Sequence, residues 1–310
     1  MKSISIGISS AASWAWGTSL IIGMQIMQQK GFSAWFIWAI SNSLTLALLG
    51  FLYSKGLLCR QVFNNKVVKY AAILIQCFCL IIQMNIIYQV LGDIFQLAHS
   101  IKYFITSSIG ILFTLLMYKK GLFTSILTDI GQFIITIISI IAIITLGIYF
   151  NTPLVEITNS SYSDILWSIW SACILFSGPI GDMQHWQRVE LNNGIHGYYL
   201  GTIFFSLYML LIGVMSLFQF TPIMNAILLI AVLCVTTSTI DSIAVALHEI
   251  SNKIIGTIVA ICICLLWGIF VEIGVLYLWS YAGIYRVLFA ISIILLAIYV
   301  KKQNTYMLTK

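Results

Sequence analysis

Residues 235–242 read VTTSTIDS and place hydroxyl and carboxyl side chains inside an apolar run that covers residues 222–248. An apolar run of this length predicts a helix that crosses a membrane. On that helix Ser238, Asp241 and Ser242 share one face, because they lie at positions i, i+3 and i+4. Such polar groups are costly at membrane depth unless they bind something. The stretch therefore predicts an ion site made of hard oxygen ligands on a helix wall.

The threonines of this stretch also have a structural interpretation, because hydroxyls on membrane helices often donate to a carbonyl one turn earlier. We expect this role for Thr236 and Thr237. For Ser238, Thr239 and Asp241 we expect ion binding, because a buried carboxylate requires a partner. A shell of neutral hydroxyls and carbonyls favours a monovalent cation, since calcium sites generally contain several carboxylates.

The composition predicts an all-α integral membrane protein. Of 310 residues, 61% are hydrophobic, 8% are charged and three are proline, and the mean hydropathy is +1.03. Apolar runs of about twenty residues recur along the chain, whereas the strands of membrane barrels alternate apolar and polar residues. The sequence contains no phosphate-binding loop, no serine elbow and no metal-ligand spacing, so we expect no enzyme, no organic cofactor and no nucleic-acid partner.

Hydropathy predicts ten transmembrane helices in a single domain that covers residues 1–310. The predicted spans are residues 6–28, 32–53, 67–91, 103–118, 122–150, 165–187, 197–218, 222–248, 254–279 and 282–300. The basic residues support this count, since twelve fall on the side of the N-terminus and three, Lys30, Lys102 and Arg286, on the other. Basic residues concentrate on the cytoplasmic side, so both termini are predicted to be cytoplasmic.

The long polar connection at residues 151–164 divides five predicted helices from five. An odd number of helices per half requires the second half to enter from the opposite side, which predicts a 5+5 inverted repeat, residues 1–150 and 164–300. In such transporters the first helix of each half is broken near the midplane. We expect the breaks at residues 9–13, which are rich in serine, and at residues 177–181, which contain Pro179. The serines also suit close packing of helices.

Three short motifs resemble those of the sodium/solute symporter family. Residues 120–132, KGLFTSILTDIGQ, are similar to its GGL...YTD..Q signature, and residues 181–188, GDMQHWQR, to its DQ...QR segment. Residues 238–242, STIDS, are similar to its ST.DS segment. The chain departs from the family at Lys120 and Met183, and it covers only the ten-helix core, without the flanking helices of most members.

The resemblance implies a LeuT-like fold with broken helices 1 and 6, and sodium as the coupling ion. It implies a sodium site between helices 1 and 8, formed by side-chain oxygens of Ser238 and Thr239 and by backbone carbonyls of Val235, Ala12 and Ala15. It also implies the inner membrane of a bacterium as the location.

Further intramembrane polar residues are assigned to coupling and gating. Asp129 and Asp241 lie at comparable depth on two helices and predict an ion pathway. Gln132 belongs to the same motif as Asp129, and we assign it to this pathway as well. An alternative role for Asp129 is a salt bridge to Lys119, Lys120 or Arg188. Near the end of the sixth span we expect a gating ion pair of Asp182 with Arg188, accompanied by Gln187.

The solute is expected to contact residues near the two breaks. The candidates are Ser13, Trp14, Trp16, Ser177 and Gln83. Aromatic side chains provide apolar or cation-facing walls, although most aromatic residues of such a chain pack or face lipid. No Lys or Arg is expected near the midplane, which disfavours a multiply anionic solute.

The sequence thus predicts a sodium-coupled symporter of a small polar organic solute that works by alternating access in a lipid bilayer. Two alternatives stay open. The first is a transporter driven by protons that titrate Asp129 or Asp241. The second is a membrane sensor or partner subunit that does not transport. Neither the identity of the solute nor the oligomeric state follows from the sequence.

Overall fold

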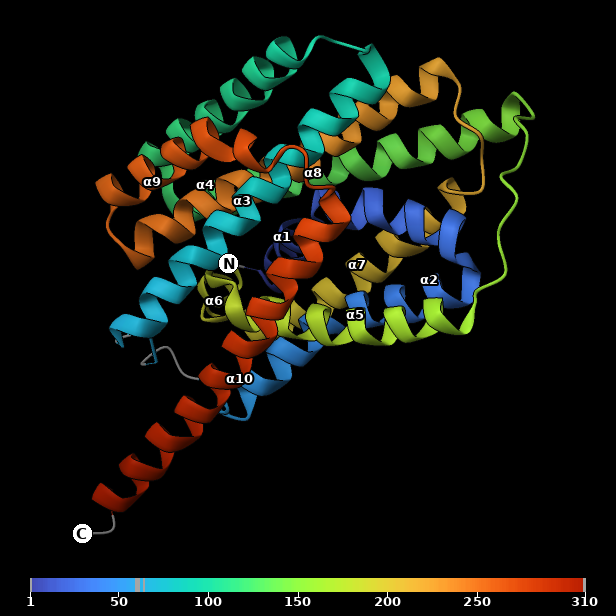
Figure 1. Ribbon diagram of the computed structural model, residues 1–310. Coiled ribbons are helices and arrows are strands. Elements are labelled where there is room, and N and C mark those ends of the chain that lie inside the picture. The colour runs from blue at the N-terminus through green and yellow to red at the C-terminus, as the bar shows by residue number, and fades with distance from the viewer. Residues whose placement is uncertain (1, 59–61, 64, 309–310) are drawn as a thin grey trace.

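The computed structural model describes residues 2–58, 62–63 and 65–308, which form a bundle of helices with no β-strand among these residues (Figure 1). The ten α-helices and one 3₁₀-helix are α1 (Ser3–Trp14), α2 (Gly17–Ser54), α3 (Lys66–Phe95), α4 (His99–Tyr149), α5 (Tyr162–Gly181), α6 (Met183–Val189), α7 (Gly194–Met215), α8 (Pro222–Ile250), α9 (Lys253–Leu266), η2 (Trp267–Phe270) and α10 (Val275–Leu308). Several helices are preceded by a residue whose side chain caps the first turn. These residues are Asn65, Ser161, Thr221 and Asn252.

Nine helices in the described part of the chain are long and apolar enough to cross a membrane, which agrees with an all-α membrane protein. The sequence predicts ten because it separates residues 6–28 from residues 32–53, whereas the count of nine takes the two arms of α2, which join at Gly31, as one helix. Gly31 has a φ of 86° and reverses the chain without a loop. The two arms of α2 then run antiparallel, since Gly23 lies against Trp38 and Ser19 contacts Asn42.

The first arm of α2 continues the course of α1 beyond a short break. Gly7 of α1 packs against Gly197 and Gly201 of α7, and Gly23 of α2 packs against Ile212, about four turns further along the same helix. Together α1 and this arm therefore follow α7 as one interrupted rod. The predicted break in the first span is present, but it lies at Ala15 and not within residues 9–13, which are helical.

The helices form two groups that meet along the middle of the bundle (Figure 1). One group contains α1, α2, α5, α6 and α7, and the other contains α3, α4, α8 and α9, with α10 against α3 and α5. Among the described helices of membrane length, α3 is the most enclosed: 72% of its most apolar 18 residues are buried, compared with 28% in α9. Polar residues on α3 and α8 are therefore held inside protein and away from lipid.

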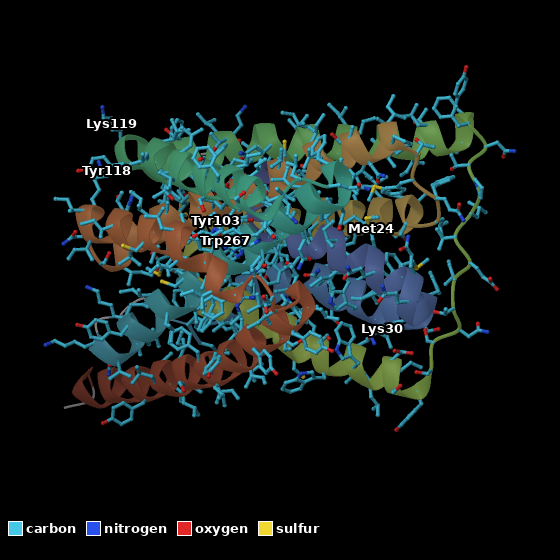
Figure 2. All side chains as sticks on the ribbon, turned by 45° about the horizontal axis from the view of Figure 1, so that its top comes forward. Met24, Lys30, Tyr103, Tyr118, Lys119 and Trp267 are labelled. Carbon is cyan, nitrogen blue, oxygen red and sulfur yellow. The ribbon has the colours of Figure 1, made fainter. Side chains whose placement is uncertain are left out.

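The connections gather at two ends of the bundle. Lys30 pairs with Asp164 at 2.9 Å, and Leu154 forms a bridge with Phe218, so these connections share one end, which we call the Lys30 end. Lys119 lies at the opposite end, which we call the Lys119 end (Figure 2). The turn in α4 at Gly121, where φ is 69°, lies at this second end.

Arg286 corrects the predicted boundary of the last span. The sequence counts it among the basic residues on the outer side, near the start of the span predicted at residues 282–300, but α10 begins at Val275. Arg286 is therefore eleven residues inside a helix, and only 2% of it is exposed. Glu272, the nearest acidic residue in the sequence, is exposed in the connection before α10.

Candidate functional site

Asp129 of α4 lies at the centre of a buried polar cluster. Its Oδ2 accepts hydrogen bonds from the hydroxyls of Ser9 at 2.6 Å and Ser13 at 3.2 Å, both on α1. Its Oδ1 accepts one from Ser238 of α8 at 2.7 Å. Arg188 of α6 lies 2.7 Å from Oδ2, and both side chains of this ion pair are fully buried. One carboxylate thus connects α1, α6 and α8.

Arg188 is held by more contacts than its ion pair with Asp129. Its Nε donates to Ser9 Oγ at 2.9 Å, its Nη1 to the Gln184 carbonyl at 2.7 Å and its Nη2 to Ser242 Oγ at 2.9 Å. A buried guanidinium with this many partners is fixed in place, because each lost contact leaves an unpaired polar group. Arg188 is therefore part of the same cluster.

Asp241 of α8 is the second buried carboxylate, and it has a different set of partners. Oδ2 lies 2.8 Å from the Thr128 hydroxyl, and Oδ1 lies 3.1 Å from Ser125 and 3.2 Å from Ser242. All three partners are hydroxyls. Among the residues that the structure describes, none forms an ion pair with Asp241.

We call these residues the Asp129 cluster: Ser9, Ser13, Ser125, Thr128, Asp129, Arg188, Ser238, Asp241 and Ser242. All are buried except Thr128, which is half-buried. Each of three helices contributes its members at spacings of three or four residues, so that they share a face. When both carboxylates are ionised, they and one guanidinium give the cluster an excess negative charge inside the protein. A buried unpaired charge is costly, so the cluster then requires a further cation or a proton.

The donor set fits a monovalent ion better than a divalent one. Among the described residues, no group of three or more His, Cys, Asp or Glu side chains is arranged to hold a metal. The cluster offers six hydroxyls and two carboxylates, and Arg188 already neutralises one of these. Divalent calcium usually takes six to eight oxygen ligands with several carboxylates, which this set does not provide.

The threonines of α8 show both of the roles considered from the sequence. Thr236 and Thr237 donate to Val232 and Leu233 carbonyls at 2.7 and 2.6 Å, as expected for structural hydroxyls. Thr239, expected to bind the ion, donates to the Val235 carbonyl at 2.9 Å. Thr239 and Val235 thus contact each other, while Ser238 points into the Asp129 cluster. Gln132 donates to Thr237 at 3.0 Å and lies beside the cluster, not in it.

The first helix break is stabilised by α3. α1 ends at Trp14, and the N–H of Ala15 donates to the carbonyls of Ala11 and Ala12. The N–H of Gly17 donates to Gln83 Oε1 at 3.3 Å instead of continuing the helix. Ala12 and Ala15, whose carbonyls are expected to bind sodium, therefore lie at the break.

The second break lies at Asp182, one residue beyond the predicted stretch at residues 177–181. Pro179 remains inside α5, where it removes one backbone donor just before the break. The Asp182 carboxylate accepts from Gln76 at 2.9 Å and also from Gln184. The expected Asp182–Arg188 ion pair does not form, because Arg188 pairs with Asp129. The alternative salt bridge considered for Asp129 is the one observed.

The predicted solute contacts lie around the two breaks, and several of them already have partners within the protein. Ser13 belongs to the Asp129 cluster, and Ser177 donates to the Ile174 carbonyl at 2.8 Å. Trp14 donates to the Asn42 carbonyl at 3.1 Å. Its ring packs against Gly178, where a Cβ atom would collide with it. The other two candidates, Trp16 and Gln83, lie near the first break.

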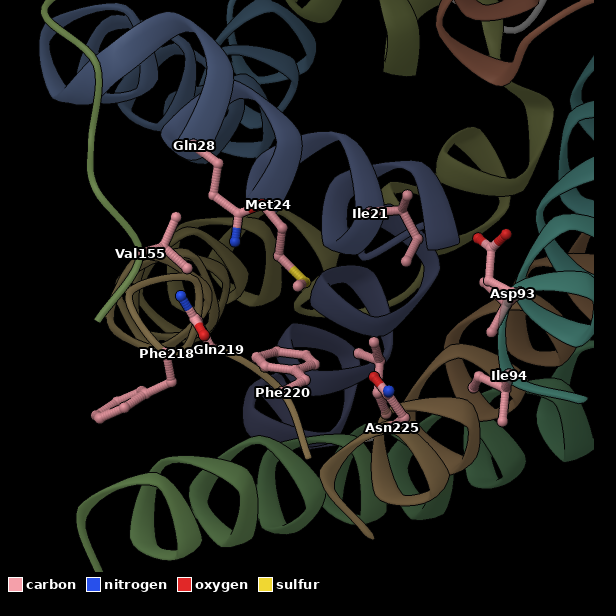
Figure 3. A pocket seen from close by; sticks show the side chains of 12 residues that line it. Ile21, Met24, Gln28, Asp93, Ile94, Val155, Phe218, Gln219, Phe220 and Asn225 are labelled. Carbon is pink, nitrogen blue, oxygen red and sulfur yellow. The ribbon is translucent and has the colours of Figure 1, made fainter. Parts of the chain in front are cut away.

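A pocket opens at each end of the bundle. The one at the Lys30 end has a volume of about 400 Å³, and Met24, Asp93 and Asn225 are among the residues on its wall (Figure 3). The one at the Lys119 end has a volume of about 370 Å³ and is lined by residues that include Lys119 and Gln187. Gln187, predicted to act in gating, also contacts Glu249. The buried Asp129 cluster is exposed to neither end.

Sequence reasoning did not identify Ser9, Ser125 or Thr128 as cluster members. A usable signal was present, because Ser9 and Ser13, and Ser125 and Asp129, repeat the i, i+4 spacing of Ser238 and Ser242. The choice among partners depends on tertiary packing, which spacing on a single helix does not determine.

Comparison with known proteins does not assign a family: no family model matches the chain, and no curated protein matches it either. Function is therefore inferred from the geometry of the site.

Proposed function

We propose that this chain is a sodium-coupled symporter of a small polar organic solute and that it works by alternating access. The observation that carries the proposal is the uncompensated carboxylate of the Asp129 cluster, Asp241, which is fully buried and contacted only by hydroxyls. A stable membrane protein does not keep such a charge without a counterion. A reversible counterion is the requirement for an ion-coupled transporter.

Sodium suits the cluster because its oxygens are hard and mostly neutral. Ser238, Ser242 and the carboxylates bring oxygen atoms of α8 and α4 close together, and we propose that the backbone carbonyls of Ala12 and Ala15, at the break after α1, complete the shell. Carbonyls released at broken helices coordinate sodium in many transporters. The motif resemblance to sodium/solute symporters supports the same ion.

The arrangement of helices supports alternating access. Two interrupted rods, α1 with the first arm of α2 and α5 with α6, lie in one helix group and face α3 and α8 of the other. The pockets at the two ends are separated by buried residues, so a relative tilt of the groups would open one end while closing the other. We propose a LeuT-like 5+5 repeat in a cell membrane, with both termini on the cytoplasmic side.

In this mechanism sodium stabilises the contact between α1 and α8. Ser9 and Ser13 approach Asp129 from one side, and Ser238 approaches it from the other. Neutralising the excess charge holds these helices together and fixes the break where the solute binds. Because binding free energies are linked, solute must then raise sodium affinity by the factor by which sodium raises solute affinity.

A second candidate is proton coupling on the same fold. It is favoured by the contacts of Asp241, which has three hydroxyl partners and no cationic one, an environment that also suits a protonated carboxyl. Uptake into proteoliposomes separates the two. Solute accumulation that follows an imposed sodium gradient at equal pH supports sodium, and accumulation that follows only a pH gradient supports protons.

The direct test is sodium-dependent thermal stability of the purified protein in detergent, with potassium and choline at equal ionic strength. Sodium at about 100 times its Kd should stabilise the folded state by about 2.7 kcal/mol. The double variant Ser238→Ala/Thr239→Ala should lose this increment. A matched control is Thr145→Ala/Ser292→Ala, which removes two exposed hydroxyls. Each of them donates to the carbonyl four residues earlier, as Thr239 does. Equal stability of the wild type in all three cations would refute sodium coupling.

A further inference from the structure

Arg286 is a buried cation without a carboxylate partner. Its guanidinium lies over the ring of Trp16, with 4.3 Å between Cζ and the ring centroid, and Nη2 donates to the Cys79 sulfur at 2.7 Å. Nε is buried and has no hydrogen-bond partner. In the described part of the chain Arg286 forms no ion pair, although Asp182 is near enough for the two charges to interact. Thiols are weak acceptors, so the guanidinium is poorly satisfied.

Three residues of α3 connect Arg286 to both helix breaks. Gln76, Cys79 and Gln83 lie at positions i, i+3 and i+7, so they share one face over a length of about 10 Å. Gln76 contacts Asp182 at the second break, Cys79 contacts Arg286, and Gln83 contacts Gly17 at the first break. The face therefore passes from one break to the other with Arg286 beside its middle.

This region concentrates buried polar atoms that lack partners. Two are acceptors, the Oε1 atoms of Gln76 and Gln184. Three are donors, namely Gln83 Nε2, Trp16 Nε1 and Arg286 Nε. Buried polar groups are nearly always hydrogen-bonded, and each unsatisfied one costs about 1–3 kcal/mol. Five of them on the elements around the two breaks indicate a surface that is completed by a ligand.

We propose that this region binds the transported solute and that the solute is a small carboxylate that also carries a hydrogen-bond donor, as amino acids and 2-hydroxy acids do. The inference rests on the proposed transport function and specifies its substrate class. Arg286 binds the carboxylate, because a guanidinium presents parallel N–H groups that match its two oxygens. The amide oxygens of Gln76 and Gln184 accept from the amino or hydroxyl group.

The charges around the site explain why one carboxylate is favoured and a polyanion is not. Arg286 is the cation of the site, and Asp182 is the anion near it. When both are ionised, Arg286 and Asp182 balance each other, so a solute carboxylate adds one negative charge, which the ammonium group of an amino acid offsets and a second carboxylate would double. A neutral sugar offers the guanidinium only hydroxyl acceptors, which bind a cation less strongly than a carboxylate does.

The pocket at the Lys30 end lies near this region along two helices. Ile21 of α2 and Val90 of α3 line that pocket. Gln83 lies on α3 about 10 Å further from the Lys30 end at 1.5 Å per residue, and Trp16, which directly precedes α2, lies about 7 Å beyond Ile21. The wall of the pocket is therefore about one to two helical turns from two of the residues around Arg286.

The test measures thermal stabilisation by ligand panels in sodium and in potassium. The first panel contains glycine, alanine, proline, serine, glycolate and lactate, the second contains their carboxamides, and the third contains neutral sugars and polyols. We expect at least one carboxylate to stabilise the wild type in sodium, and its carboxamide to bind at least about tenfold more weakly. Arg286→Gln should weaken the same carboxylate by about 10- to 100-fold while keeping the sodium increment.

Stabilisation of Arg286→Gln by sodium shows that the variant is folded. If Arg286→Gln does not fold, Arg286→Lys and Trp16→Phe serve, since the first keeps the charge but loses the paired donors and the second removes the indole N–H while it keeps an aromatic ring. Both should weaken carboxylate binding. Lys102→Gln, which removes a cation that stacks on Tyr88 outside this region, should not.

The inference is overturned if no carboxylate stabilises the wild type, if a sugar or carboxamide does so equally well, or if binding is unchanged in the Arg286 variants. These results are separable from a failure of the proposed function. A sodium increment without carboxylate binding keeps the ion site and rejects the solute. Carboxylate binding of equal strength in sodium and potassium keeps the solute site and rejects sodium coupling.

Discussion

Asp129 and Asp241 should respond in opposite ways to the same isosteric change. Asp241→Asn removes the unpaired charge and keeps an amide oxygen that accepts from Ser125 and Ser242, at 3.1 and 3.2 Å in the native cluster. The new amide N–H₂ faces Thr128, whose hydroxyl turns to accept. Asp129→Asn instead removes the partner of Arg188, which lies 2.7 Å from Oδ2 with both side chains fully buried.

The magnitudes follow from burial. Leaving one member of a buried ion pair uncompensated costs about 3–5 kcal/mol, so Asp129→Asn should destabilise the protein by about that amount. Each hydroxyl contact of Asp241 contributes about 0.5–1.5 kcal/mol, and Asn retains most of them. The desolvation penalty removed with the charge is several kcal/mol. In sodium-free buffer Asp241→Asn should therefore equal or exceed the stability of the wild type.

The assay is thermal and denaturant unfolding in detergent, followed by intrinsic tryptophan fluorescence and titrated with sodium chloride against choline chloride. The wild type should gain about 2.7 kcal/mol at 100 times its sodium Kd. Asp241→Asn should gain nothing, because its cluster is already neutral. The reasoning is refuted if Asp241→Asn retains the full sodium increment, or if it is destabilised in sodium-free buffer as strongly as Asp129→Asn.

Three further changes test the fold around these sites. Gly31→Ala should destabilise by more than about 2 kcal/mol, because a Cβ at its φ of 86° is strained and meets the Thr158 carbonyl; urea unfolding measures this. The matched change Gly131→Ala, on a helix with open space around it, should be neutral or stabilising by up to about 1 kcal/mol in the same assay. Lys30→Gln breaks a pair whose side chains are 25% and 21% exposed, so it should cost at most about 1 kcal/mol and leave the sodium increment unchanged in cation titrations.

The membrane class and most helix positions follow from the sequence because hydropathy is a local property. Apolar length alone places α3, α7 and α8 within a few residues of their observed limits. The boundary between residues 6–28 and 32–53 predicts the reversal, but QQKG reads as a polar loop, whereas one residue with positive φ reverses the chain. Gly is required there because its missing side chain admits that conformation.

Charged residues are less predictable because their environment is tertiary. Arg286 and Glu272 are both single charges in the outer parts of the predicted spans 282–300 and 254–279, and only the count of basic residues places Arg286 outside. Glu272 is exposed, whereas Arg286 turns inward onto Trp16 and Cys79. The partner of Arg188 was equally uncertain. Local spacing offers Asp182 on the adjacent turns, but the fold brings Asp129 from a distant helix to the guanidinium.

Coupling between the two sites follows from the short helices that they share. Asp182 begins α6 beside Gln76, and Arg188 near its end joins the Asp129 cluster. In the same way, α1 carries Ser9 into that cluster and leads to Trp16 beneath Arg286. A shift of α1 or α6 therefore changes the ion cluster and the solute region together. In the proposed mechanism rigid helices transmit such shifts, so neutralising the cluster biases both helix breaks toward one arrangement, which is the differential binding that coupled transport requires.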